Sequence, residues 1–167
     1  MCGTLKLSPC IKMIVSDFDG IFTDNTVFVL SETQKIKKIS YKDLMGVSIA
    51  VKNNIKIAII SGEQSPEIDY IAEKFNLEDI HQGIRIKQPV LQQIKEKYGL
   101  SNDEILYVGD DVNDIECLKC TKYAVSVDEA NYKVKQLPHI QITTAKAGDG
   151  AFREIVDNLI ELKNNEK

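Results

Sequence analysis

The sequence predicts an α/β fold in which a mostly parallel β-sheet is flanked by helices. Three observations support this prediction. Short apolar runs rich in β-branched residues alternate with stretches of helical periodicity. The apolar runs are continuous, which is typical of strands that are covered on both faces. Strands that alternate with helices form βαβ units, and such units build parallel sheets.

The expected elements follow one another in a regular order. Strand-like runs are MIVS, IKIAII, ILYVG, YAVSV and IQITT, which begin at residues 13, 55, 105, 123 and 140. Helical patterns are DLMGVSIAVKNN, PEIDYIAEKF, PVLQQIKEKYG, VNDIECLKC and AFREIVDNLIELK, which begin at residues 43, 66, 89, 112 and 151. This order predicts a single Rossmann-like domain over residues 1–167, a length that suits one hydrophobic core.

One segment interrupts the alternation of strands and helices. Residues 26–40, TVFVLSETQKIKKIS, contain two strand-like halves around the polar SETQ. This pattern predicts a β-hairpin inserted after the first strand. We expect the hairpin to be exposed, which makes it a candidate for a subunit contact.

Composition and charge exclude several classes of protein. The chain is 43% hydrophobic and 28% charged, as in ordinary globular proteins rather than disordered or fibrous ones. The net charge is −4 and the basic residues are scattered, so we expect no nucleic-acid partner. No apolar run approaches the roughly 18–20 residues that a membrane span needs, so no membrane partner is expected. The first residues do not resemble a secretory signal, and the expected location is the cytoplasm.

The four cysteines, Cys2, Cys10, Cys117 and Cys120, are expected to be reduced thiols. Cys117 and Cys120 form a C-x-x-C within a helical stretch, but no second C-x-x-C or His pair completes a zinc site. We interpret the two as small residues of a helix face, with redox or metal chemistry as the alternative.

Polar side chains follow three of the predicted strands. Asp17 and Asp19 come after the first strand, Ser61 ends the second, and Asp110 and Asp111 follow the third. Ligands of open α/β sheets bind outside the carboxyl ends of the strands, so we expect these residues to converge on one rim. Asp111 is also a candidate N-cap for the helix that follows.

Several carboxylates without a neighbouring His or Cys form an oxygen-only site, which favours Mg²⁺ over zinc or copper. A calcium-binding loop of the EF-hand type requires an acidic residue at its fifth position and Gly at its sixth. Here Gly20 occupies the fourth position and Ile21 the fifth, so that interpretation fails. Beside Mg²⁺, one carboxylate can act as a nucleophile on phosphorus and another as a general acid and base.

These motifs resemble those of the haloacid dehalogenase-like phosphatases. DFDGIFTD is similar to the family's D-x-D-G-x-x-T-D nucleophile loop, IAIISG to its second motif and GDDVND to its acidic fourth motif. Lys87 fits the lysine of the third motif. The matches lie between Asp17 and Asp114 in the family's order, and the short loops between them resemble the subgroup without a large cap.

The resemblance implies that Asp17 is the nucleophile and Asp19 the general acid and base. Mg²⁺ would be held by the Asp17 carboxylate, the Asp19 backbone carbonyl and Asp110.

The resemblance also implies that Ser61 and Lys87 hold the phosphoryl oxygens, and a hydroxyl donor and a compact cation suit that task. Asp111 would lie near the metal through water. Asp114 is either a residue that orients these groups or merely part of the first helical turn.

Further details resemble one branch, the 3-deoxy sugar-acid phosphatases, some of which act on 3-deoxy-D-manno-octulosonate 8-phosphate. The likeness rests on QG followed by Lys87, on the hairpin and on the ending AGDGAFRE. The chain departs from the branch at Ala147-Gly148, where a Gly-Gly pair is usual, and at DLMG, where D-G-x-G is usual. These departures bear on substrate details rather than on the chemistry.

Substrate choice within this branch depends on two residues. The octulosonate phosphatases have Arg after the Ser-Gly of the second motif, whereas this chain has Glu63. The related phosphatases of nine-carbon sugar acids have Glu there and a Lys eleven residues on, which here is Lys74. The pair favours a nonulosonate (sialic-acid-like) 9-phosphate as substrate, with the eight-carbon 8-phosphate as the alternative. Glu63 and Lys74 can also be read as ordinary surface residues.

The resemblance further implies a homotetramer. The hairpin would lie at the subunit interfaces, and the loop Gly148–Gly150 would lie near a neighbour's active site or simply form a turn before the last helix. An alternative of another class is a non-catalytic assembly module, like the tail domain of sugar-acid cytidylyltransferases. We expect such a module to lose the nucleophile or the lysine, and this chain keeps both Asp17 and Lys87.

Overall fold

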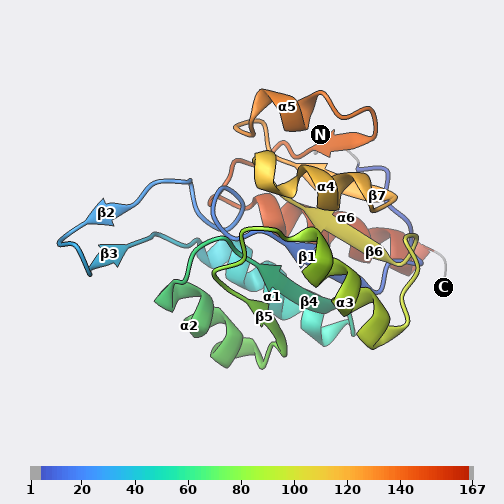
Figure 1. Cartoon of the computed structure of the whole chain (residues 1–167). Coiled ribbons are helices and arrows are strands. Elements are labelled where there is room, and N and C mark those ends of the chain that lie inside the picture. The colour runs from blue at the N-terminus through green and yellow to red at the C-terminus, as the bar shows by residue number, and fades with distance from the viewer. Residues whose placement is uncertain (1–4, 166–167) are drawn as a thin grey trace.

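A six-stranded parallel sheet forms the centre of the computed structural model, which describes residues 5–165 (Figure 1). Its strand order is β5-β4-β1-β6-β7-β8, and every pairing within it is parallel. The strands are β1 (Met13–Ser16), β4 (Lys56–Ile60), β5 (Asp79–His81), β6 (Ile105–Val108), β7 (Tyr123–Ser126) and β8 (Ile140–Ile142). The predicted α/β fold is confirmed.

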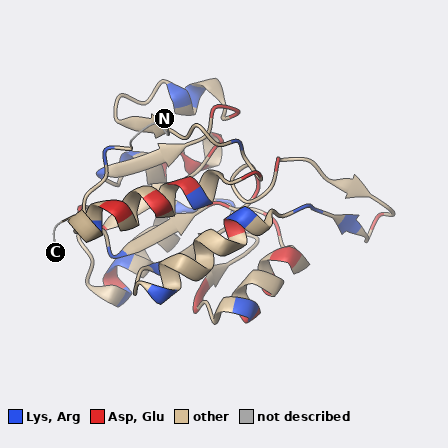
Figure 2. Cartoon of the chain, turned by 180° about the vertical axis from the view of Figure 1, so that it is seen from behind, with Lys and Arg blue, Asp and Glu red and all other residues tan. Residues whose placement is uncertain are grey.

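Helices cover both faces of this sheet. They are α1 (Tyr41–Lys52), α2 (Pro66–Phe75), α3 (Gln88–Tyr98), α4 (Ile115–Lys119), α5 (Tyr132–Lys135) and α6 (Ala151–Asn165), with a 3₁₀ turn, η1 (Val112–Asp114), before α4. Helices α3 and α4 lie in front of the sheet in Figure 1, whereas α1 packs against α6 on the opposite face, which Figure 2 shows from behind. This two-sided cover explains why the strands read as continuous apolar runs.

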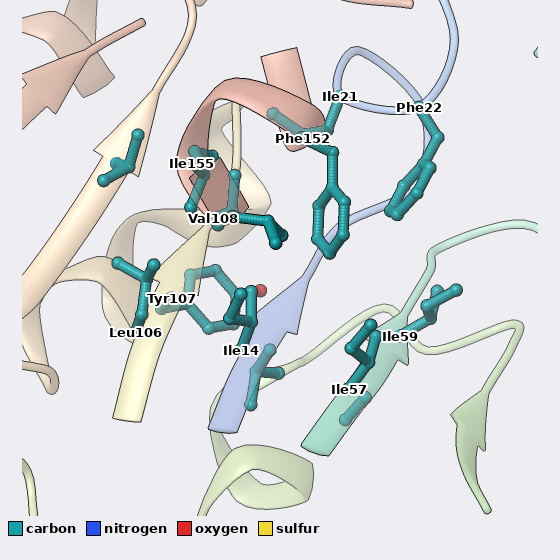
Figure 3. Close-up of a cluster of buried hydrophobic side chains, with 14 of the residues drawn as sticks. Ile14, Ile21, Phe22, Ile57, Ile59, Leu106, Tyr107, Val108, Phe152 and Ile155 are labelled. Carbon is teal, nitrogen blue, oxygen red and sulfur yellow. The ribbon is translucent and has the colours of Figure 1, made fainter. Parts of the chain in front are cut away.

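The core joins the sheet to the loop that follows β1. Figure 3 shows Ile14, Ile57 and Leu106 on neighbouring strands, and Phe22 beside Phe152 of α6. The ring centroids of Phe22 and Phe152 are 4.5 Å apart. Because Phe22 belongs to the DFDGIFTD segment, this contact anchors the loop of acidic residues on the core.

Two short elements escaped sequence analysis. Strand β5 has only three residues, DIH, and helix α5 has only four, YKVK. Neither is long enough to show a clear period. Helix α1 begins two residues before its predicted start because the Ser40 side chain accepts a hydrogen bond from the Lys42 N–H and caps it.

The predicted hairpin is present and projects from the sheet (Figure 1). It consists of β2 (Phe28–Val29) and β3 (Lys35–Ile36), which pair antiparallel. Its apolar side chains are exposed, with Phe28 at 68% and Leu30 at 62%.

The described cysteines are free thiols: Cys10 is exposed, Cys117 is buried and Cys120 is half-buried. Burial raises the pKa of Cys117 to about 12, so its thiol stays protonated near neutral pH. This favours the interpretation as helix-face residues. Cys2 lies outside the described residues. Among residues 5–165, none of the helices combines the length and apolar character that crossing a bilayer requires.

Candidate active site

The carboxyl ends of three neighbouring strands bring the predicted site residues together. In the register of the sheet, Ser16 of β1 lies between Ile59 of β4 and Val108 of β6. Polar residues follow each of these strands, as expected. They open onto a pocket of about 280 Å³, whose lining includes Asp17, Asp19, Ser61, Glu63, Asp110 and Asp111.

Asp17 and Lys87 form a buried ion pair at the base of this site. The Lys87 Nζ lies 2.8 Å from Asp17 Oδ1 and 2.8 Å from Asp114 Oδ1, and its side chain is fully buried. Burial opposes the charged form of Lys87, but the two carboxylates outweigh it and hold its pKa above the usual value. Burial and the charge of Asp114 raise the pKa of Asp17 well above its usual range, although Lys87 opposes this.

Asp114 connects the groups around Lys87. Its Oδ1 also accepts a hydrogen bond from the Tyr107 hydroxyl at 2.8 Å, and its Oδ2 accepts from the backbone N–H groups of Asp110 and Asp111 at 3.1 and 3.3 Å. The side chain is completely buried. Of the two roles considered for Asp114, these contacts favour a residue that orients its neighbours.

Asp110 approaches the backbone of the acidic loop closely. Gly20 has a φ of +80°, and a Cβ there would lie 1.9 Å from Asp110 Oδ2, so only glycine leaves room for this carboxylate. Burial and the neighbouring Asp114 and Asp111 raise the pKa of Asp110 to about 7. The Asn25 side-chain amide donates a hydrogen bond of 3.3 Å to Asp110 Oδ2.

The donor set fits a hard divalent cation. Carboxylate oxygens of Asp17, Asp110 and Asp114 lie within 4.8 Å of one another. Asp114 already accepts four hydrogen bonds, so Asp17 and Asp110 are the better placed ligands. Burial, followed by the negative charge of Asp114, raises the pKa of both Asp17 and Asp110, and a bound cation would offset both effects. The chemistry of these residues therefore fits Mg²⁺.

The Asp19 carboxylate turns towards the base of the hairpin. Its Oδ1 accepts a hydrogen bond from the Thr23 hydroxyl at 3.1 Å, and its Oδ2 lies 2.5 Å from the Nζ of Lys37. Its side chain remains 25% exposed and lines the pocket. Because the carboxylate contacts Thr23 and Lys37, the metal role implied by the resemblance would fall to the backbone carbonyl of Asp19.

Ser61 and Asp111 are also held by local contacts. Ser61 is buried, and its Oγ accepts a hydrogen bond from the Glu63 N–H at 3.2 Å. The Asp111 side chain accepts from the Val112 N–H at 2.7 Å and caps η1, which agrees with its interpretation as an N-cap.

The structure separates Glu63 from Lys74. Glu63 is exposed at the pocket, 4.0 Å from the Nζ of Lys35. Lys74 lies in the last turn of α2, where its Nζ donates to the Tyr70 hydroxyl at 3.0 Å. Most of the length of α2 separates the two residues, since a helix rises about 1.5 Å per residue. Within the described chain, Lys74 does not line the pocket.

The loop before α6 packs on the acidic loop of its own chain. The Gly148 N–H donates to the Ile21 carbonyl at 2.9 Å. A Cβ at Gly148 would lie 2.6 Å from backbone atoms of Thr23 and Asp24, so glycine permits this close approach.

Sequence reasoning missed Asn25, Lys37 and Tyr107. Lys35 and Lys37, two residues apart in a predicted strand, are a weak signal for a basic face on the hairpin. Tyr107 lies within the apolar run ILYVG. No local pattern distinguishes a tyrosine whose hydroxyl binds a site residue from one that only packs in the core.

Comparison with known proteins gives a consistent result. A family model described as haloacid dehalogenase-like hydrolase matches residues 79–155. A structure described as a HAD family hydrolase from Streptomyces avermitilis has a TM-score of 0.86 and 32% identity, covering 95% of this chain and 96% of that one. The 3-deoxy-D-manno-octulosonate 8-phosphate phosphatase of Moraxella catarrhalis, in complex with magnesium, phosphate and KDO, has a TM-score of 0.88 and 28% identity, covering 94% of this chain and 90% of that one. The phosphatase of the same name from Salmonella typhi is 26% identical over 151 residues, which are 90% of this chain and 79% of the relative.

Proposed function

The chain belongs to the haloacid dehalogenase-like hydrolases, and we propose that it is a Mg²⁺-dependent phosphatase of a 3-deoxy-2-keto sugar acid. The observation that carries the proposal is the buried Asp17–Lys87–Asp114 cluster beside Asp110 at the carboxyl ends of the strands. Such a cluster combines a candidate nucleophile with the positive charge that a phosphoryl group requires.

In the proposed reaction, Asp17 attacks phosphorus while the bond to the leaving oxygen breaks, which gives an aspartyl-phosphate. Asp19 donates a proton to that oxygen and later takes one from the water that hydrolyses the aspartyl-phosphate. Lys87 and the Ser61 hydroxyl stabilise the phosphoryl oxygens. Mg²⁺, held by Asp17, Asp110 and the Asp19 carbonyl, supplies charge neutralisation when it is bound.

We propose 3-deoxy-D-manno-octulosonate 8-phosphate, or a close analogue, as the substrate. The sequence pattern favoured a nonulosonate 9-phosphate, and the comparisons do not confirm that choice. Two of the three relatives reported above, from Moraxella catarrhalis and Salmonella typhi, are octulosonate phosphatases, which supports the eight-carbon alternative. The position of Lys74 away from the pocket also weakens the nine-carbon argument. The nine-carbon ester remains a second candidate because Glu63 does line the pocket.

Steady-state kinetics with both sugar-acid phosphates and with 4-nitrophenyl phosphate test this function. We expect Mg²⁺-dependent hydrolysis, with kcat/KM at least about 10-fold higher for the eight-carbon ester, equivalent to about 1.4 kcal/mol. The reverse preference would select the nine-carbon candidate. A folded, Mg²⁺-saturated protein that hydrolyses none of the three esters would support the non-catalytic assembly module.

Glu63→Ala is expected to lower kcat/KM for the preferred sugar acid by about 10–100-fold, because the pocket loses a hydrogen-bond acceptor for the sugar hydroxyls. The small ester 4-nitrophenyl phosphate should react almost unchanged. Equal losses on both esters would assign Glu63 to the structure of the loop. Lys74→Ala, measured in parallel, should change neither ester, and a loss confined to the sugar acid would place Lys74 in a site formed with a neighbouring subunit.

We also propose a homotetramer in which the hairpin lies between subunits. The exposed side chains of Phe28, Val29 and Leu30 support this, since contiguous exposed apolar residues mark interaction surfaces. Replacing Phe28 and Leu30 together by Ser is therefore expected to shift sedimentation from tetramer to smaller species. Tyr132→Ser, which changes an exposed side chain on α5, is the matched control. Wild-type protein that sediments as a fully active monomer would contradict the proposal.

A further inference from the structure

Lys37 has an unusual environment for a hairpin lysine. Its side chain is only 8% exposed, whereas those of Lys35 and Lys38 are 49% and 67% exposed. Its Nζ lies 2.5 Å from Asp19 Oδ2 and 5.9 Å from the centre of the Phe18 ring. Burying an ammonium group is costly unless the group is paired with an opposite charge. The ion pair with Asp19 is therefore the main interaction that keeps the Lys37 side chain in place.

A backbone hydrogen bond holds the chain at Lys37, the residue directly after β3. The Lys37 N–H donates to Glu67 Oε1 at 3.0 Å, and the Ser65 hydroxyl donates to the other oxygen of Glu67. Glu67 lies in the first turn of α2, so the chain that returns from the hairpin is tied to a helix that packs against α1 (Figure 1). The backbone contact with Glu67 and the ion pair with Asp19 therefore both hold the Lys37 side chain beside Asp19.

The two oxygens of Asp19 are held from different sides. Oδ1 accepts from Thr23, which belongs to the same loop, and Oδ2 pairs with Lys37, which comes from the hairpin. Removing Lys37 would leave the Thr23 hydroxyl as the remaining one of these two partners. The Asp19 carboxylate would then rotate more freely. A proton donor must be held within hydrogen-bond reach of the leaving oxygen to act efficiently.

We propose that Lys37 is a positioning residue that orients Asp19 for proton transfer to the leaving oxygen. This inference rests on the proposed phosphatase function and goes beyond it, because it assigns the inserted hairpin a part in the chemistry. The proton moves from Asp19 to the oxygen while the phosphorus–oxygen bond breaks, and that bond's electron pair stays on the oxygen. An alkyl leaving group depends on this proton, whereas 4-nitrophenolate departs readily without it.

The test compares kcat/KM for the sugar-acid phosphate, an alkyl ester, with kcat/KM for 4-nitrophenyl phosphate. This parameter reports steps only up to departure of the leaving group, so later hydrolysis of the aspartyl-phosphate does not enter. Lys37→Met should lower kcat/KM for the alkyl ester by about 10–100-fold, because general acid catalysis typically contributes a factor of at least this size. It should lower kcat/KM for the aryl ester by less than about 3-fold. Lys37→Arg should recover much of the loss because it keeps a cation that can pair with Asp19. Lys38→Met removes a neighbouring exposed charge and should change neither value.

A double-mutant cycle separates positioning from direct contact with the sugar. In an Asp19→Ala background, Lys37→Met should cause no further loss on the alkyl ester, because the residue through which Lys37 acts is absent. An additional loss of the same size in that background would overturn the proposal, and so would equal losses on the two esters in the single variant.

Glu67→Ala provides a second variant if Lys37→Met unfolds at a lower temperature than Lys38→Met. This substitution removes the acceptor of the Lys37 N–H and keeps the Lys37 ammonium. It should give a smaller loss confined to the alkyl ester, and an equal loss on both esters would count against the proposal. Wild-type protein that hydrolyses neither ester would instead contradict the proposed function itself.

Discussion

Asp17→Asn is expected to lower kcat by at least about 10⁴-fold on every phosphate ester, because an amide cannot serve as the nucleophile on phosphorus. The substitution keeps the shape of the side chain, and its oxygen can still accept from the Lys87 ammonium. It also removes one charge from a cluster in which burial and Asp114 raise the pKa of Asp17. We therefore expect the thermal midpoint of the variant to equal or exceed that of the wild type.

Kinetics and mass spectrometry together check this prediction. Rapid acid quench of the wild type during turnover should trap phosphate on Asp17, and the variant should carry none. Asp157→Asn is the matched control, because Asp157 lies on the surface of α6 in an ion pair with Arg153. Residual turnover above about one part in a hundred by pure Asp17→Asn would exclude the covalent route.

Removal of the metal is expected to abolish activity, and addition of Mg²⁺ should restore it. Asp110→Ala should lower kcat/KM by about 10²–10³-fold at the wild type's Mg²⁺ concentration, since it deletes a proposed ligand of a cation that supplies several kcal/mol of charge stabilisation. The same substitution on the exposed Asp128 provides a control. Full activity after exhaustive chelation would contradict a metal-dependent mechanism.

Thermal unfolding gives a readout of the same site that is independent of activity. The pKa of Asp110 is about 7 in the folded protein, raised by burial and by Asp114 and Asp111, and it is near 3.8 for an unperturbed Asp. Between these two pH values, the metal-free folded state binds more protons at Asp110 than the unfolded state does. Asp110 therefore lowers the stability of the metal-free protein as the pH rises through that range. Mg²⁺ favours the carboxylate form, so the rise in Tm that it causes should be larger at about pH 8 than at about pH 6. In Asp110→Ala, the rise should be smaller and should vary less with pH.

The patterns along the chain predicted much of the fold. Continuous apolar runs identified the inner strands, because a strand buried on both faces has no polar alternation. The same reasoning failed for β5 and α5, whose three and four residues are too few to show a period. The hairpin was predicted from two short strand-like halves around a polar turn, but its exposure on the outside of the sheet was an expectation that only the structure confirmed.

The sequence by itself determined which polar residues stand at the ends of strands. Asp17, Ser61 and Asp110 reach one rim because each follows a strand of a parallel sheet, and the order of strands and polar residues along the chain predicts this. Only the tertiary structure decided that Asp114 joins Lys87 to Tyr107, and that Lys37 rather than Lys35 is buried against Asp19. Those contacts depend on where the hairpin and α3 dock against the sheet. The burial that results sets the strength of each charge pair, and no spacing along the chain encodes it.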